Sequence, residues 1–369
     1  MPVGGARTAR AVLIECVVVA AIVFAAYAAS HPDPVATLGR LYDDEVYLSV
    51  GKSIAEGHGY RSAQLVGTPV HVKFPPLLPA VYAGAWATFG SLDAVARLAL
   101  WSSIVVTAVA AGTLWWLARR ELGVGVAFAA LFVAVPIVTD RAMFYFSGAA
   151  SEPWMLLGWA VSLVLARRLT RVRAGGAPAA VAVGLGLTLA ATALARTQGI
   201  AIAAGLLGGL ALTRVGWRTV AVAVSATAVP LIVWRVWHGA MMNRGPLSPL
   251  PDQLGYTAWI PTAGIGTFTR FAIAMVRTSV PSYWSSAANV LVGWTSAKTL
   301  LLASVILASG LAGTLLLVRS FPAMAGSLLA TLGVIAVWPY IQDRFLTPLL
   351  PVLGVAAAFP LGNLGDQHR

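Results

Sequence analysis

The sequence predicts an all-α integral membrane protein, a bundle of about ten transmembrane helices. Hydrophobic residues make up 59% of the 369 residues and charged residues only 10%, whereas a soluble domain carries about 25% charged residues. Apolar runs recur along the whole chain, and most approach the ~20 residues that cross about 30 Å of hydrocarbon. The runs cover residues 11–29, 98–117, 123–139, 153–166, 178–195, 199–213, 217–234, 299–318, 323–340 and 345–361.

The basic residues predict how these helices are oriented. The formal net charge is +12, but Lys and Arg stand in the short connections between apolar runs, so we expect membrane lipids and no nucleic acid as partners. Basic residues in short loops mark the cytoplasmic side. Both chain termini are then cytoplasmic, and alternate loops face out of the cell membrane. The orientation rests on Arg7, Arg10, Arg119, Arg120, Arg167, Arg168, Arg171, Arg173, Arg214, Arg218 and Arg319.

The apolar segment 75–90, PPLLPAVYAGAWATFG, is expected to be a juxtamembrane or re-entrant helix on the outer side. Pro75 and Pro76 suit the start of such a helix. A full span here would place Arg119 and Arg120 outside and break the alternation of loops. We therefore predict outer juxtamembrane helices in the first extracytoplasmic loop.

The chain is expected to form one polytopic membrane domain, residues 1–369, with no appended soluble domain. Two outer loops are long, at 30–96 and 236–297, and long loops usually hold function. The first apolar run, with basic residues before it and AYAAS at its end, also fits a signal peptide. A membrane helix is favoured because the run is long enough to span. The single Cys16 lies in this run and excludes a disulfide framework.

The acidic residues gather on one predicted side of the membrane. With the orientation above, 10 of the 13 lie outside, so we expect the chemistry on the extracytoplasmic face. They are Asp33, Asp43, Asp44, Glu45, Glu56, Asp93, Asp140, Glu152, Asp252 and Asp343.

Three adjacent acids, Asp43, Asp44 and Glu45, follow the first apolar run. The spacing of apolar residues predicts a short helix over 43–56, with Asp43 or Asp44 at its N-cap. One acid is enough to cap a helix, and this stretch offers three. Tyr47 lies one turn after Asp43 on the same face, and a carboxylate placed there can act as a general base.

Two further segments of the predicted outer face carry a charged residue near a helix start. In HVKFPPLLP, Lys73 either extends to lipid headgroups or holds the phosphate of a lipid-linked substrate. In SEPW, Glu152 either caps a membrane helix together with Ser151 or meets Asp43 across an outer cavity.

Two arginines are also predicted on this face. Arg196, in ARTQG, occupies a tight turn that is predicted to lie outside, where the positive-inside preference does not favour arginine. We therefore favour an anionic ligand over a side chain that extends to lipid headgroups. Arg344 follows Asp343 in QDRFLTPLLP, and adjacent helical residues do not face each other. Arg344 is therefore expected to meet another partner.

The order DDEVY, KFPPLLP, SEP, ARTQG and QDRFLTPLLP resembles the membrane-embedded GT-C glycosyltransferases that use polyprenyl-phosphate sugars. Within them it is most similar to the branch of protein O-mannosyltransferases and lipid A aminoarabinose transferases. The resemblance runs from about residue 11 to 351. It implies a GT-C-type helical bundle whose first outer loop supplies the catalytic base.

Carried over residue by residue, the resemblance implies catalytic roles for Asp43, Asp44 and Glu152. Aligning on Tyr47 gives Asp43 the role of base, although the extra acid Glu45 leaves the choice between Asp43 and Asp44 open. The implied substrate-binding residues are Tyr47, Lys73, Arg196 and Arg344. Lys73 stands one position away from its place in the nearest branch.

These observations predict an inverting hexosyl- or pentosyltransferase of the cell envelope. It would move a sugar from a polyprenyl-phosphate donor to a hydroxyl of a lipid, glycan or protein acceptor. No cofactor is expected, but a divalent cation held by Asp43, Asp44 and Glu152 remains an alternative. The rival hypotheses are a transporter or flippase of lipid-linked or small anionic substrates, and a non-catalytic partner subunit.

Overall fold

The computed structural model describes residues 5–30, 38–39, 43–171, 179–243, 245–247, 264–292, 296–338 and 342–364. Helices account for the regular structure of these ranges, apart from isolated bridges that join Val70 to Arg61 and to Leu247. The predicted all-α class is confirmed for the described residues.

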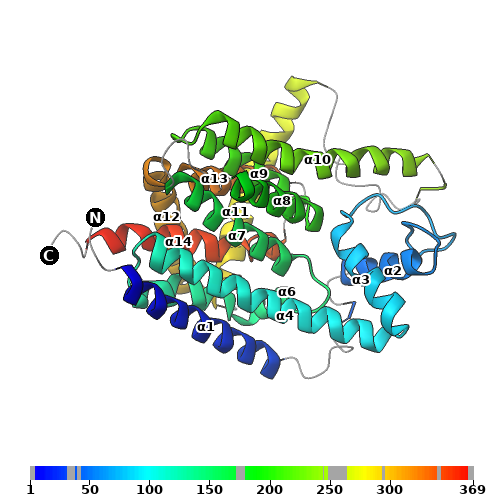
Figure 1. Ribbon diagram of the computed structural model, residues 1–369, viewed down its shortest axis with the longest axis horizontal. Helices are drawn as coiled ribbons and strands as arrows, with labels where there is room; N and C mark the ends of the chain where they lie inside the picture. Colours follow the sequence, from blue (N-terminus) through cyan, green and yellow to red (C-terminus); the bar gives the residue numbers. More distant parts are fainter. Residues whose placement is uncertain are drawn as a thin grey trace.

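Most of the long helices run side by side in one bundle (Figure 1). Close pairs are α9 with α13, α8 with α10, α1 with α4, and α12 with α14, while α7 contacts both α4 and α8. The helices are α1 (Gly5–Ser30), α4 (Leu92–Trp116), α7 (Glu152–Arg171), α8 (Ala179–Ala195), α9 (Gly199–Ala211), α10 (Trp217–Met242), α11 (Ile265–Val292), α12 (Ala297–Ser320), α13 (Pro322–Val337) and α14 (Leu349–Leu364).

Small residues allow these helices to approach closely. A Cβ atom on Gly205 of α9 would overlap the carbonyl of Gly326 in α13, and a Cβ on Gly326 would overlap the carbonyl of Gly205. Such contacts are typical of helices that pack in lipid. Lipid tails are as apolar as the side chains, so close packing replaces the hydrophobic effect as the source of stability.

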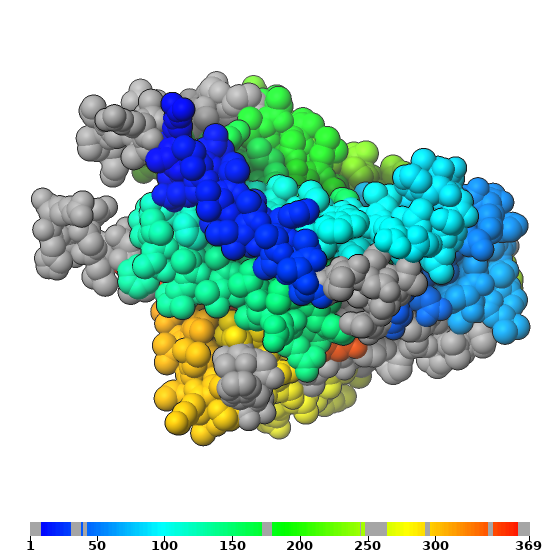
Figure 2. Space-filling model, turned by 90° about the horizontal axis from the view of Figure 1, so that it is seen from below, coloured from blue at the N-terminus to red at the C-terminus, as the bar shows by residue number. Residues whose placement is uncertain are grey.

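Large apolar side chains cover the outside of the bundle. On α1, which lies on the surface in Figure 2, Leu13, Ile14, Val17, Val18 and Ile22 are each at least half exposed. Such a face requires an apolar surrounding. Together with the composition, it indicates a multi-pass membrane protein.

Four described helices are long and apolar enough to cross a membrane, or five if one bent pair counts as a single span. The four are Ala9–Ser30, Leu92–Glu121, Trp217–Met242 and Ala297–Ser320. Shorter apolar helices, among them α8, α9 and α13, account for further predicted runs. The total of about ten spans therefore stays a prediction.

The apolar run 123–139, predicted as one spanning helix, is broken. Its pieces meet the next helix, α6 (Asp140–Phe146), at 57°. Pro136 has no amide hydrogen to continue the helix, and Thr139 is extended and caps α6 through a hydrogen bond from the amide of Ala142 to its Oγ1 at 3.2 Å. The pieces are α5 (Val126–Ala129), the π-helical turn η3 (Ala130–Ala134) and the 3₁₀ turn η4 (Val135–Ile137).

The range 236–297, predicted as an outer loop, carries much helix. The helix α10 continues to Met242, and the 28-residue α11 fills Ile265–Val292. Residues 248–263 lie outside the described part of the chain. The sequence did not predict α11, because Ser279 and Pro281 divide its apolar residues into short groups.

Two short helices, α2 (Asp43–Ala55) and α3 (Leu77–Phe89), sit together at one end of the bundle, away from the start of α1 and the end of α14 (Figure 1). They match the helices predicted over 43–56 and 75–90. Tyr47 and Val50 of α2 and Tyr82 of α3 form a small separate core with Val95 of α4. We call this part of the molecule the α2–α3 end.

Candidate active site

Four charged residues from distant segments meet at the α2–α3 end of the bundle. Asp43 begins α2, Glu152 begins α7, Arg196 lies in the turn between α8 and α9, and Arg344 lies in the 3₁₀ turn η7 (Asp343–Phe345). Each was predicted as a site residue. The structure places them in one cluster, although their positions span most of the chain.

The four side chains alternate in charge. Arg344 Nη1 lies 2.8 Å from Asp43 Oδ2, and Arg344 Nε lies 4.0 Å from Glu152 Oε1. Arg196 Nη1 in turn lies 2.8 Å from the same Glu152 oxygen. The residues Asp43 and Glu152 are only 4% and 2% exposed. We call this buried set the ion-pair cluster.

Arg196 is held by neutral groups as well as by Glu152. Its Nη1 donates to Ser151 Oγ at 2.7 Å, and its Nε donates to Gln198 Oε1 at 3.0 Å. A buried guanidinium is stable only when such partners replace its water. Ser151, predicted as a helix cap, thus accepts a hydrogen bond from the side chain of Arg196.

The turn that carries Arg196 depends on Gly199. The amide of Gly199 donates to the Arg196 carbonyl at 2.8 Å. A Cβ at this position would stand 2.6 Å from the backbone of Thr192 and Ala193, closer than packed atoms approach. The sequence ARTQG therefore closes the turn tightly enough to point Arg196 at Glu152.

Arg344 is separated from its neighbour Asp343, as the sequence predicted. Asp343 Oδ2 accepts a hydrogen bond from Asn289 of α11 at 2.9 Å, while Arg344 pairs with Asp43. The ring of Phe345 lies 5.7 Å from the guanidinium of Arg344 and 5.2 Å from that of Arg196. Phe345 therefore packs beside both arginines of the cluster.

The environment of Asp43 suits a proton acceptor. Burial raises its pKa above the ordinary value, and the nearby Glu152 charge adds to this rise. The positive charges of Arg344, Arg196 and Lys73 act in the opposite direction. The balance leaves the pKa raised, which strengthens the carboxylate as a base while the arginines still favour its ionised form.

Asp44 is fastened to the backbone. Its Oδ1 accepts from the Glu45 amide at 2.8 Å and its Oδ2 from the Gly39 amide at 3.1 Å. These bonds lower the pKa of Asp44, but burial outweighs them and the pKa is raised. Asp44 thus stabilises the start of α2, and Asp43 is the acid that faces the arginines.

Lys73 is positioned by a folded loop. His71 Nε2 accepts from the Phe74 amide at 3.0 Å, and its Nδ1 lies 3.0 Å from Ser62 Oγ. Burial lowers the pKa of His71 to about 3, so the ring stays neutral and holds the loop. The hydroxyl of Tyr60 donates to the Phe74 carbonyl at 2.9 Å and fixes the other side.

Lys73 is one of the residues that line an apolar groove of about 630 Å³. The groove runs between the loop 72–75 and the facing ends of α8, α9 and α10, and Leu194, Ile200 and Leu231 are among its walls. The charge of Lys73 also acts on Asp43. Lys73 therefore links this groove, which we call the Lys73 groove, to the ion-pair cluster.

Tyr47, predicted to bind substrate, lies in the small core of the α2–α3 end. It is 1% exposed, and its ring centre is 5.1 Å from that of Phe74. Its packing supports α2 and the loop that carries Lys73, and a substrate contact remains a prediction.

A divalent cation at Asp43, Asp44 and Glu152 is the alternative that the sequence left open. Among the described residues, no group of three or more His, Cys, Asp or Glu side chains is arranged to hold a metal ion. Asp43 and Glu152 are instead bridged by Arg344.

Comparison with known proteins leaves the family open. No family model and no curated protein matches the sequence. A solved structure, the archaeal oligosaccharyltransferase AglB from Archaeoglobus fulgidus in complex with an inhibitory peptide and a dolichol-phosphate, aligns with a TM-score of 0.48 and 16% identity. The alignment covers 88% of this chain and 46% of that one, so this chain spans about half the length of AglB. A similarity of this size assigns neither family nor activity.

The sequence did not predict the neutral partners of the cluster. Gln198, Asn289 and Phe345 each contact a charged residue of the site or its neighbour. Gln198 and Phe345 stand within two residues of a predicted site arginine, and this proximity in sequence could have identified them as site residues. Asn289 has no such signal, because α11 reaches the site only through the fold.

Proposed function

We propose that this protein is an inverting glycosyltransferase that moves a sugar from a polyprenyl-phosphate donor to an acceptor hydroxyl. The observation that carries the proposal is the ion-pair cluster together with the Lys73 groove. A carboxylate with a raised pKa, two arginines and a lysine lie together where a membrane-held phosphodiester can approach. This donor provides both the apolar chain and the anion that such a site favours.

In the proposed reaction, Asp43 accepts the proton of the acceptor hydroxyl. The oxygen attacks the anomeric carbon of the donor sugar from the side opposite to the phosphate. The bond between that carbon and the phosphate oxygen breaks, and the electron pair leaves with the polyprenyl phosphate. Arg344, Arg196 and Lys73 stabilise the charge that develops on this leaving group.

The ion pair between Arg344 and Asp43 predicts the order in which the two substrates bind. A donor phosphate near Lys73 would compete with Asp43 for the guanidinium of Arg344, which lies 2.8 Å from the carboxylate. When Arg344 turns to the phosphate, Asp43 loses its partner and can accept a proton. Binding of the donor thus activates the base, and the acceptor reacts second.

Glu152 has a positioning role in this proposal. It pairs with Arg196 and also lies near Arg344. Removing the carboxylate would leave two guanidinium groups without a shared counter-charge. Glu152 therefore keeps both arginines beside Asp43.

The site belongs on the extracytoplasmic face in this proposal, with both chain termini in the cytoplasm. The transporter hypothesis predicts polar groups or broken helices near the bilayer midplane. The position of the charged cluster at one end of the bundle supports the transferase, although the 57° bend before α6 is a feature that a transporter would share.

The direct test is release of polyprenyl phosphate by the purified protein in nanodiscs. A panel of polyprenyl-phosphate hexoses and pentoses is supplied with a crude envelope extract as acceptor. Release from one member of the panel supports the proposal, and EDTA in a parallel reaction shows whether a divalent cation takes part. Movement of an intact donor across sealed liposomes, without release of polyprenyl phosphate, would support the transporter instead.

A further inference from the structure

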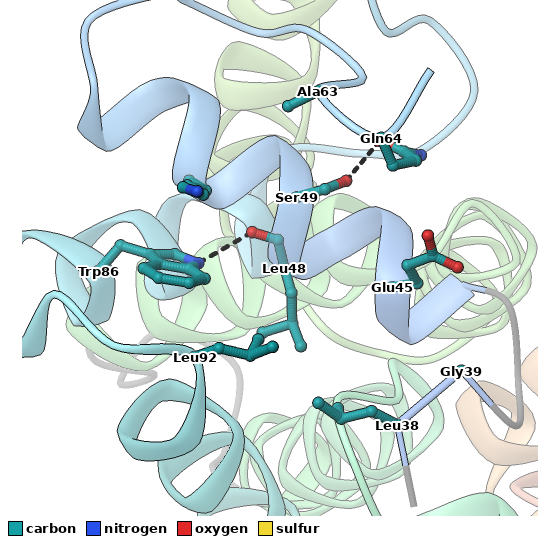
Figure 3. Close-up of a pocket in the computed structure, with 10 residues that line it drawn as sticks. Leu38, Gly39, Glu45, Leu48, Ser49, Ala63, Gln64, Trp86 and Leu92 are labelled. Carbon is teal, nitrogen blue, oxygen red and sulfur yellow. Dashed lines mark hydrogen bonds between the residues drawn. The ribbon is translucent and has the colours of Figure 1, made fainter. Parts of the chain in front are cut away.

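A second pocket lies on the opposite face of α2 from Asp43. It has a volume of about 500 Å³, within the range of about 300–1,000 Å³ that small-molecule sites occupy. Figure 3 shows Trp86 on one side of it and Glu45 on the other, with Ser49 and Gln64 along one edge. We call it the α2 pocket.

The polar groups of the α2 pocket include both donors and acceptors. The Glu45 side chain is exposed and offers two acceptor oxygens. Ser49 donates to Gln64 Oε1 at 2.5 Å. This bond leaves Gln64 Nε2 buried and, within the described part of the chain, without a hydrogen-bond partner. A buried amide without a partner is costly, and a ligand with an acceptor oxygen would satisfy it.

The rest of the pocket is apolar and aromatic. Leu48 and Leu92 form one side, near the indole of Trp86, whose Nε1 donates to the Leu48 carbonyl at 3.0 Å. The ammonium of Lys52 lies 5.5 Å from the centre of the Trp86 ring. An aromatic ring beside a carboxylate, an amide and an ammonium suits a ligand that has hydroxyl groups at its edge and a C–H face.

The α2 pocket adjoins the proposed base through the start of α2. Gly39 lines the pocket, and its amide donates to Asp44 Oδ2 at 3.1 Å. Glu45 lines the pocket two residues after Asp43. The first turn of α2 therefore supplies residues both to the ion-pair cluster and to the pocket.

We propose that the α2 pocket binds a non-reacting sugar unit of a saccharide acceptor. Glu45 and Gln64 bind its hydroxyl groups, and Trp86 packs against its C–H face. The inference deepens the proposed transferase function and rests on it for the role as acceptor. A saccharide fits this pocket better than a peptide does, because adjacent hydroxyls can use the carboxylate and the free amide hydrogens together.

Binding is tested without turnover by saturation-transfer NMR on the full chain in nanodiscs that contain no glycolipid. The probes are methyl α-D-mannopyranoside, methyl β-D-glucopyranoside and the tripeptide Gly-Ser-Gly. The protein carries Asp43→Asn, so the result does not depend on catalysis. We expect saturation transfer to at least one glycoside and none to the tripeptide.

The steric control uses two exposed positions of one loop. Ala63→Trp fills the pocket that Ala63 lines, whereas Val66→Trp places the same side chain outside it, at a fully exposed position. The glycoside signal should disappear in Ala63→Trp and persist in Val66→Trp. Equal signals in both variants, no glycoside signal in the parent, or a signal from the tripeptide alone would overturn the proposal.

Steady-state kinetics with a saccharide acceptor test whether the pocket takes part in the reaction. With a saccharide acceptor, Ala63→Trp should raise the acceptor KM about tenfold and leave kcat within about twofold, because it removes binding energy that is not specific to the transition state. An unchanged KM would refute the role as acceptor site. If the protein transfers no sugar, the proposed function fails, while the NMR result still decides whether the pocket binds saccharides.

Discussion

Arg344 Nη1 lies 2.8 Å from Asp43 Oδ2, so the buried carboxylate that we propose as the base is paired with a partly buried arginine. The two residues come from opposite ends of the chain, one at the start of α2 and the other in a turn before α14. In this arrangement the same arginine can restrain the base or bind the donor phosphate. The order of substrate binding follows from that choice.

Replacing Arg344 should change the pH dependence of the reaction. In the proposed reaction Asp43 can act as a base only when ionised, so activity should fall as the pH drops through its pKa. That pKa is already raised by burial, and the charge of Arg344 opposes the rise. In Arg344→Met the pKa should rise further, and the acidic limb of kcat/KM against pH should move to higher pH.

The conservative variant Arg344→Lys is the control, because it keeps a positive charge beside Asp43. Its acidic limb should stay near that of the wild type, even if kcat falls through loss of the planar guanidinium. An acidic limb at the same pH in Arg344→Met and in the wild type would contradict the coupling between these two residues.

Glu152→Gln should destabilise the protein. It removes the partner of Arg196 at a site where both side chains are more than nine-tenths buried. Breaking a buried pair by removing one member costs about 3–5 kcal/mol, whereas replacing both members by apolar residues costs much less. Chemical unfolding in detergent should therefore rank Glu152→Gln below the double variant Glu152→Met with Arg196→Met. The opposite ranking would show that this pair does not hold the cluster.

Gly199→Ala should disturb the turn that presents Arg196. The added Cβ would stand 2.6 Å from the backbone of Thr192 and Ala193, and overpacking of this kind costs about 1–3 kcal/mol. The control is Gly208→Ala in the same helix, where nothing lies within 4 Å of the new atom. A lower Tm and lower activity are expected for Gly199→Ala alone. Equal behaviour of the two variants would contradict the need for a tight turn.

Much of the site could be predicted from the sequence, because its charged residues interrupt an apolar chain. In a bundle of Ala, Leu and Val, burial of a charged residue such as Arg196 or Glu152 is costly unless the residue has a charged or polar partner. The alternation of basic loops predicted them on one side of the membrane, and helical spacing predicted Asp43 on the same face as Tyr47. The structure brings Asp43, Glu152, Arg196 and Arg344 together, but their chemical roles remain predictions.

The parts that could not be predicted depend on tertiary contacts. The bend before α6 arises where Pro136 and Thr139 interrupt one apolar run, and a hydropathy pattern does not register such a bend. The helix α11 falls in a range of mixed polarity, so its contribution of Asn289 to the site had no local signal. The pairing of Arg344 with Asp43 depends on how η7 meets α2, which only the fold determines.

Lys73→Met should weaken donor binding. Lys73 lines the Lys73 groove and acts electrostatically on Asp43, so its loss removes a charge from the proposed phosphate site. We expect the donor KM to rise about tenfold, equivalent to about 1.4 kcal/mol. The control is Arg235→Met, at an exposed position of the same groove. The steady-state assay would contradict this role if Lys73→Met left the donor KM unchanged or affected it no more than Arg235→Met.

The central claim is that Asp43 is the base of a sugar transfer. Its most direct test is polyprenyl phosphate release by Asp43→Asn in nanodiscs, compared with wild type and with Asp140→Asn, which changes an exposed acid outside the cluster. We expect a loss of at least about 100-fold for Asp43→Asn, the scale of general-base catalysis, with unchanged elution on size exclusion. We also expect wild-type release for Asp140→Asn. Wild-type release by a folded Asp43→Asn protein would contradict the account.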